Sequence, residues 1–159
     1  MDAALLASML PIEAIKSADQ SVTNSTTLTN DTELKLPVVS GATYRGELVL
    51  YYVAPTGNDL DYAWSVPTDS GGRRGMIGPD PTTGAVVDLS AMQSRVSGAF
   101  NTEFTLGGAG GSHKVAFERF LLVAGGDGNI TLQFAENTAG AGTSATVLTN
   151  SHLVLKRVS

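Results

Sequence analysis

The sequence predicts an all-β protein, an antiparallel two-sheet sandwich that is jelly-roll-like and carries a short N-terminal helical arm. Three observations lead to this fold class. Apolar and polar residues alternate along most of the chain, which is the pattern of strands with one buried face. The chain of 159 residues contains 18 glycines, many of them in clusters that separate these segments. No helical period follows residue 16, so two packed layers of strands are the economical way to bury the apolar faces.

The first segment is predicted to be the arm. Its apolar residues lie at helical spacing, and Pro11 would end a helix there. We predict an arm over residues 1–16 and a single sandwich domain over residues 17–159. The arm either packs on its own domain or docks on a neighbouring subunit or capsid through Leu5, Leu6, Met9 and Leu10.

The next segments predict four strands. Residues 21–31 are rich in Ser and Thr and predict an edge strand with a turn at Asn30-Asp31. Residues 32–39 alternate cleanly, and residues 43–54 form the longest predicted strand. Residues 59–67 alternate as well, with Leu60, Tyr62, Trp64 and Val66 on the inner face and Asp59, Asp61, Ala63 and Ser65 on the outer one.

The middle of the chain is rich in Gly and Pro. Residues 68–84 predict a long loop with at most a short strand at Met76-Ile77, and residues 85–89 predict a short strand. Residues 90–98 fit either a helical turn or a loop. Residues 99–106 predict a strand, and 107–112 a flexible loop.

The last third predicts a long strand over residues 113–124, a tight turn at 125–128 and a closing hairpin over 128–158. In that hairpin Ile130, Leu132 and Phe134 share one face. Its composition suggests a rigid support rather than a reactive site.

The candidate chemical groups are few. The two histidines, His113 and His152, lack partners at metal-ligand spacing, and cysteine is absent. Asp59 and Asp61 predict a solvated outer face, with calcium binding as the weaker alternative. Arg73-Arg74 predicts an exposed pair, or else a grip on an acidic partner or a sugar phosphate. We expect no catalytic residue, no metal and no cofactor, and hence no enzyme.

Charge and length exclude other partners. The formal net charge is −5, and the ten Lys and Arg residues are scattered, so a nucleic-acid partner is not expected. The N-terminal apolar stretch lacks a basic leader and is too short to cross a bilayer, so no membrane partner is expected. Four aromatic residues on alternating strands predict core positions, with a sugar-binding platform as the alternative: Tyr51, Tyr52, Tyr62 and Trp64.

Two stretches resemble one family. Residues 16–54, "KSADQSVTNSTTLTNDTELKLPVVSGATYRGELVLYYVA", and residues 128–158, "GNITLQFAENTAGAGTSATVLTNSHLVLKRV", look like small β-sandwich virion proteins of tailed double-stranded-DNA phages, especially those of actinobacteria. They cover a little under half of the chain, and residues 67–112 carry no matching motif. The family supplies no catalytic residues.

The resemblance implies a structural part of the virion, made in the host cytoplasm. A chain that is nearly all sandwich favours a capsid decoration protein, which binds the major capsid protein on the outer capsid surface as a homotrimer. A minor tail protein or a tail-fibre receptor-binding domain is the first alternative, and a carbohydrate-binding module that contacts a host-surface glycan is the second. The predicted subunit interface is the doubly apolar end of one strand: Val49, Tyr51 and Val53.

Overall fold

The computed structural model describes residues 10–82 and 91–159, and in these ranges the chain forms twelve β-strands in two antiparallel sheets. The larger sheet runs in the order β1 (Ile12–Ile15), β12 (His152–Arg157), β4 (Thr43–Val53), β9 (Lys114–Val123), β6 (Gly71–Pro79) and β7 (Met92–Ser97). Strand β11 (Ser144–Val147) pairs with β4 and with β2 (Gln20–Thr23) in the same sheet. The smaller sheet runs β3 (Thr29–Val38), β10 (Gly128–Glu136), β5 (Leu60–Ser65) and β8 (Phe104–Leu106).

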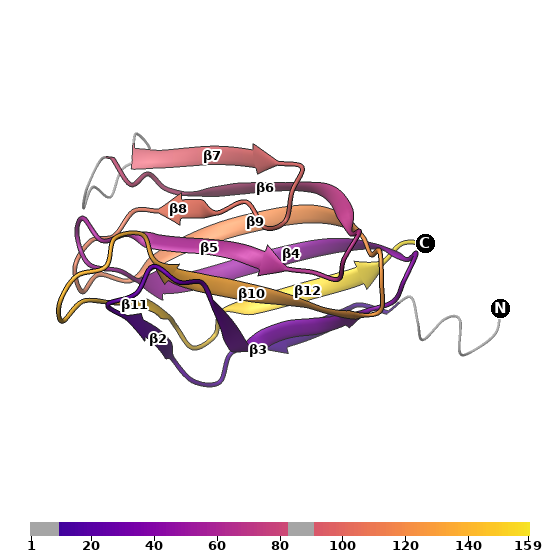
Figure 1. The fold of residues 1–159 in the computed structure, drawn as a ribbon, viewed down its shortest axis with the longest axis horizontal. Coiled ribbons are helices and arrows are strands. Elements are labelled where there is room, and N and C mark those ends of the chain that lie inside the picture. Colours follow the sequence, from indigo (N-terminus) through magenta and orange to yellow (C-terminus); the bar gives the residue numbers. More distant parts are fainter. Residues whose placement is uncertain (1–9, 83–90) are drawn as a thin grey trace.

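The chain passes back and forth between the sheets. From β3 onward it crosses to β4, back to β5, over to β6 and β7, back to β8, over to β9, back to β10 and over to β11 and β12. In Figure 1 the strands β5 and β10 therefore cross over the strands of the larger sheet. This winding is that of a jelly roll, so the predicted fold class is confirmed. In the described residues no helix is long and apolar enough to cross a membrane.

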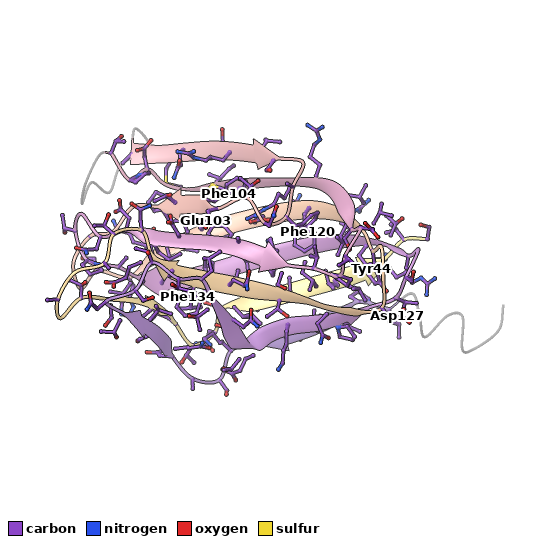
Figure 2. All side chains as sticks on the ribbon, viewed as in Figure 1. Tyr44, Glu103, Phe104, Phe120, Asp127 and Phe134 are labelled. Atoms are coloured by element: carbon purple, nitrogen blue, oxygen red, sulfur yellow. The ribbon has the colours of Figure 1, made fainter. Side chains whose placement is uncertain are left out.

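The core lies between the two sheets and follows the predicted alternation. Strand β4 alternates almost perfectly, with Leu48, Leu50 and Tyr52 buried. Figure 2 shows Phe120 and Phe134 inside the outline of the sandwich, where both are buried. Burying an aromatic or aliphatic side chain contributes about 1.5–3 kcal/mol, so these rows hold the two sheets together.

The predicted closing hairpin is wrong, because β10 belongs to the smaller sheet whereas β11 and β12 belong to the larger one. The turn after β9 likewise carries the chain from one sheet to the other rather than into a hairpin partner. Both segments have the alternation of a half-buried strand, and alternation does not tell which sheet a strand joins.

The structure corrects the start of the chain. Ile12–Ile15 form β1, which pairs with β12 from Ile12↔Leu155 to Ile15↔His152, so the last residues assigned to the arm belong to the larger sheet. Lys16 is buried and its Nζ lies 2.8 Å from Asp31 Oδ2, which fastens this strand to β3. Residues 1–9 lie outside the described residues, and with them the predicted helix.

Three further elements differ from prediction. Asn30 and Asp31 lie inside β3, and the preceding turn begins at Asn24, whose φ is 50°. The predicted loop over 68–84 contains the nine-residue strand β6. The segment 90–98, which fitted a helical turn or a loop, contains strand β7 at the edge of the sheet. The strand predicted at 85–89 lies outside the described residues.

Strand β6 was missed because its glycines resemble loop residues. At Gly78 a Cβ would lie 2.6 Å from Leu106 Cδ2, so the sheets approach too closely there for a side chain. At Gly72 a Cβ would lie 1.9 Å from the carbonyl oxygen of Leu121. These glycines serve close packing, and only the packed structure shows it.

Candidate interaction face

The outer face of the larger sheet carries an unusual number of exposed apolar side chains. On β9, Phe117 is 52 % exposed and Leu121 is 46 % exposed; Ile77 on β6 is 54 % exposed and Val96 on β7 is 67 % exposed. Three neighbouring strands thus present apolar residues to solvent. Contiguous apolar surface of this kind is typical of an interaction site.

These residues lie in register across the strands. Val49 on β4 is paired with Phe117 on β9, and Phe117 is paired with Ile77 on β6. On the other side of Val49 the row meets His152 on β12, which is polar and ends the apolar run. The result is an apolar row of Val49, Phe117 and Ile77, which crosses three neighbouring strands at right angles to their direction.

A basic row runs beside the apolar one. Lys156 is paired with Arg45, Arg45 with Leu121, and Leu121 with Arg73. All three cations are exposed. Between these two rows, Arg119 Nη2 lies 3.3 Å from Glu47 Oε1, and this is the one ion pair on this part of the described surface. We call the two rows together, with Arg119 and Glu47, the basic apolar face.

A shallow hollow interrupts this face above Gly75, which has no side chain to fill it. Val96 and Leu121 border the hollow, and Arg45, Arg73 and Arg119 surround it. Its volume is about 460 Å³. A partner could therefore place an apolar side chain against Val96 and Leu121 and an acidic side chain near the surrounding arginines.

The predicted interface residues lie on this side of the larger sheet. Val49 and Val53 are half-buried and Tyr51 is 38 % exposed, all on the outer face of β4. Their role as a subunit interface stays a prediction. Of the predicted arm contacts, Leu10 is 60 % exposed, whereas Leu5, Leu6 and Met9 lie outside the described residues. The sequence shows that Phe117 lies on one apolar face of a long strand. Which of the two faces of that strand is exposed depends on the tertiary structure.

Arg73 and Arg74, predicted as an exposed pair, separate completely. Arg73 is exposed on the basic apolar face, whereas Arg74 points inward and is fully buried. Arg74 Nε donates to Glu118 Oε1 at 2.8 Å and Arg74 Nη2 donates to Glu118 Oε2 at 2.9 Å. Arg74 Nη1 donates to the carbonyl oxygens of Phe100 and Thr102. This arginine is therefore a core residue.

Glu118 also binds two aromatic side chains, and together with Arg74 these residues form a buried polar cluster. Its carboxylate accepts hydrogen bonds from Tyr62 Oη at 2.6 Å and from Trp64 Nε1 at 2.9 Å. The Arg74 guanidinium lies over the Phe104 ring at 4.1 Å from its centroid. Burial raises the pKa of Tyr62 well above its ordinary value, and the nearby Glu118 charge adds to the effect. The cluster is closed to solvent and offers no group to a substrate.

Asp59 and Asp61 were predicted to be solvated, and that is wrong. Both are buried, and they contact strand β8, the loop after β8 and the segment after β10. Asp59 Oδ1 accepts a hydrogen bond from Gly108 N, and burial raises its pKa above the ordinary value. Asp61 accepts hydrogen bonds from Thr105 Oγ1 and Asn137 Nδ2. In the ranges 10–82 and 91–159 no three acidic or histidine side chains are grouped as metal ligands would be.

The aromatic residues proposed for a sugar platform divide in the same way. Tyr52, Tyr62 and Trp64 are fully buried, so they cannot contact a sugar in this fold. Tyr51 is the exposed one, and it lines a groove together with Asp19, His113 and Thr149. Asp19 Oδ1 accepts hydrogen bonds from Thr149 N and Oγ1, which lower the pKa of Asp19.

Comparisons with known proteins give structural likenesses. No family model matches the sequence. No curated protein matches it either. The structure of Eiger TNF from S. frugiperda is similar with a TM-score of 0.45 and 12 % identity, over 94 % of this chain and 92 % of that one.

Two viral structures are also similar. The tripod from the baseplate of bacteriophage Tuc2009 has a TM-score of 0.32 and 12 % identity, over 89 % of this chain and 65 % of that one. The VP2 subviral particle of infectious bursal disease virus has a TM-score of 0.24 and 11 % identity, over 94 % of this chain and 37 % of that one. The chain thus spans less than two thirds of either viral protein. Identities this low do not carry a function from one chain to another.

Proposed function

We propose that this chain is a non-enzymatic structural protein of a virion, and specifically a capsid decoration protein that binds the outer capsid surface as a homotrimer. The observation that carries the proposal is the basic apolar face. A sandwich whose core is already sealed between its sheets has no internal need for Phe117, Ile77 and Leu121 to be apolar. A partner that covers them gives these residues a physical role.

The two stretches that resemble virion proteins support the proposal, because they form one unit in space. Residues 16–54 contain β2, β3 and β4, and residues 128–158 contain β10, β11 and β12. The structure pairs β3 with β10, β2 with β11, and β4 with both β11 and β12. The resemblance therefore concerns a continuous half of the sandwich, built from both sheets, rather than two unrelated segments.

The proposed mechanism is adhesion. Each subunit of a symmetric oligomer contributes a modest contact with the shell, and simultaneous contacts raise the overall affinity by factors of about 10²–10⁴. Neighbouring capsid proteins are then held together against the pressure of the packaged DNA. A rigid sandwich suits this role because its contact points keep fixed distances.

Labelling of purified virions tests the proposal. An antibody against this chain, followed by electron microscopy, should decorate the head lattice. Label at the tail tip would favour the minor tail or fibre alternative, and absence of label from the virion would overturn the proposal. An unrelated antibody of the same class serves as the control.

A second experiment tests the role of the N-terminal arm. Because β1 begins at Ile12, deletion of residues 1–10 removes Leu5, Leu6, Met9 and Leu10 and leaves every described strand in place. The deleted protein should stay folded and lose attachment to empty capsids, as measured by co-sedimentation. Unchanged attachment would contradict the assignment of the arm as anchor.

Glycan binding is a second candidate function, favoured by the groove at Tyr51. An exposed tyrosine ring beside Asp19 and His113 offers a stacking surface and polar groups for sugar hydroxyls. A glycan array probed with the isolated protein tests this, with Tyr51→Ala as the variant. Retained binding by that variant would remove the groove from consideration.

A further inference from the structure

The charges of the basic apolar face are unbalanced within the chain. On β12, β4, β9 and β6 the cations Lys156, Arg45, Arg73 and Arg119 share this surface with one acid, Glu47, which gives these four strands a formal charge of +3 there; Glu13 on β1 lies beyond them, at the edge of the sheet. The whole chain carries −5, so the remainder carries −8. The molecule is therefore strongly polarised, with one basic surface on an acidic body.

One pair in the basic row is unfavourable in the isolated chain. Lys156 and Arg45 are directly opposite on neighbouring strands. Like charges in this arrangement destabilise a sheet. Within residues 10–82 and 91–159, Lys156, Arg45 and Arg73 form no ion pair, and Glu47 is paired with Arg119. An acidic partner that covers this row would relieve the repulsion.

A matching acidic and apolar surface lies at the edge of the same sheet. We call it the β1 edge. Among the described strands β1 is hydrogen-bonded only to β12, so no strand pairs with its other edge. Ile12 is 39 % exposed, Ile15 is 55 % exposed, and Leu10 just before the strand is also exposed. The acids Glu13, on the strand, and Asp19, in the loop after it, are exposed as well.

We propose that the β1 edge of one copy of this chain docks on the basic apolar face of the next copy. The apolar residues of the edge would lie against the Val49–Phe117–Ile77 row, and its acids would face the Lys156–Arg45–Arg73 row. The two surfaces differ, so the contact is heterologous, and repeated contacts of this kind close into a ring when the rotation allows. The inference specifies the self-association of the proposed homotrimer and rests on that part of the proposed function.

A second copy suits this face better than a nucleic acid. A phosphate backbone would be attracted by the basic row but would leave the apolar row of Phe117 and Ile77 uncovered. It would also be repelled by the remaining −8 of the chain. The β1 edge supplies both kinds of group, and covering an open strand edge protects it from unspecific pairing.

Charge reversal on each surface tests the contact. The variants Glu13→Arg and Arg73→Glu each place like charges in the contact, whereas the double variant Glu13→Arg/Arg73→Glu restores opposite charges with reversed sign. We expect each single variant to raise the dissociation constant about tenfold or more and the double variant to recover most of the loss. The measurement is multi-angle light scattering of the full chain over a concentration series.

Two more variants control for charge and folding. Lys35→Glu makes the same change of charge on the exposed side of β3, opposite Thr131 in the smaller sheet, and should leave association unchanged. Lys156→Glu replaces the unfavourable Lys156–Arg45 pair by an attractive one, so it should weaken association while the melting temperature of the isolated chain stays equal or rises. This variant separates loss of contact from loss of fold.

The possible outcomes distinguish the inference from the proposed function. An oligomer that neither single reversal weakens, or that the double variant does not restore, overturns this contact and leaves self-association standing. A monomer at all concentrations up to about 1 mM overturns both the contact and the homotrimer. Binding of a double-stranded DNA oligonucleotide to the face, abolished by Arg73→Glu, would replace the second copy by a nucleic acid.

Discussion

Removal of the buried Arg74 guanidinium should be among the most damaging single substitutions in this chain. In Arg74→Met the Glu118 carboxylate loses both of its hydrogen bonds from the guanidinium and stays fully buried. Breaking a buried ion pair by removing one partner costs about 3–5 kcal/mol. The carbonyl oxygens of Phe100 and Thr102 lose their donor as well, at about 1 kcal/mol each.

We therefore expect Arg74→Met to lower the free energy of unfolding by at least about 4 kcal/mol, a large part of the 5–15 kcal/mol typical of a domain. Glu118→Leu should cost at least as much, because it leaves the guanidinium, Tyr62 Oη and Trp64 Nε1 without their acceptor. The double variant should lose less than the sum of the single losses by about 3 kcal/mol, since neither charge is then left alone.

Urea unfolding followed by tryptophan fluorescence measures these changes. Trp64 is the only tryptophan and donates its indole N–H to Glu118, so its emission reports on this part of the core. Arg95→Met is the matched control, because Arg95 is exposed on β7 and should change the unfolding free energy by less than about 0.5 kcal/mol. A loss below about 1 kcal/mol for Arg74→Met, or additive losses in the double variant, would refute the reasoning.

The remaining predictions concern the contacts that hold the N-terminal strand, which we call the N-terminal clamp (Lys16–Asp31 and Ser17–Glu33), and the close contact between Gly46 and Phe120. Lys16→Met should cost about 3–5 kcal/mol in urea unfolding, because it leaves the buried carboxylate of Asp31 without its cation; a loss under about 1 kcal/mol would contradict the clamp. Hydrogen bonds from Ser17 lower the pKa of Glu33 from 4.5 to about 2, so the stability that they contribute is present above about pH 4.5 and is lost as the pH falls toward 2. Glu33→Gln should flatten that part of the pH dependence of the melting temperature, and an unchanged slope would rule out this carboxylate. Gly46→Ala should cost about 1–3 kcal/mol, since its Cβ would lie 2.0 Å from the ring of Phe120; a stability equal to wild type would show that the ring moves freely.

The strands with regular alternation could be predicted from local pattern alone. In β4 the inward residues Leu48, Leu50 and Tyr52 are apolar, and the charged Arg45 and Glu47 mark the other face as the outward one, although that face becomes apolar toward the end of the strand. Strand β9 is different, because its outward residues Phe117 and Leu121 are as apolar as its inward residues Phe120 and Leu122, so its local pattern does not choose the buried face. From such strands and the turns between them an antiparallel sandwich follows, because half-buried strands need a second layer.

Pairing between distant segments decided the rest. Arg74 and Glu118 are 44 residues apart, and neither residue type predicts burial. Only the register of β6 against β9 brings them together, and in the core each charge compensates the other. Asp59 and Asp61 follow the outward alternation of their segment, yet β8, the loop after it and the segment after β10 contact and bury them. The basic apolar face likewise exists only because four strands bring Lys156, Arg45, Leu121 and Arg73 into one row. Local periodicity predicts which side of a strand is apolar. The residues that pack against that side depend on which strands pair in the folded protein.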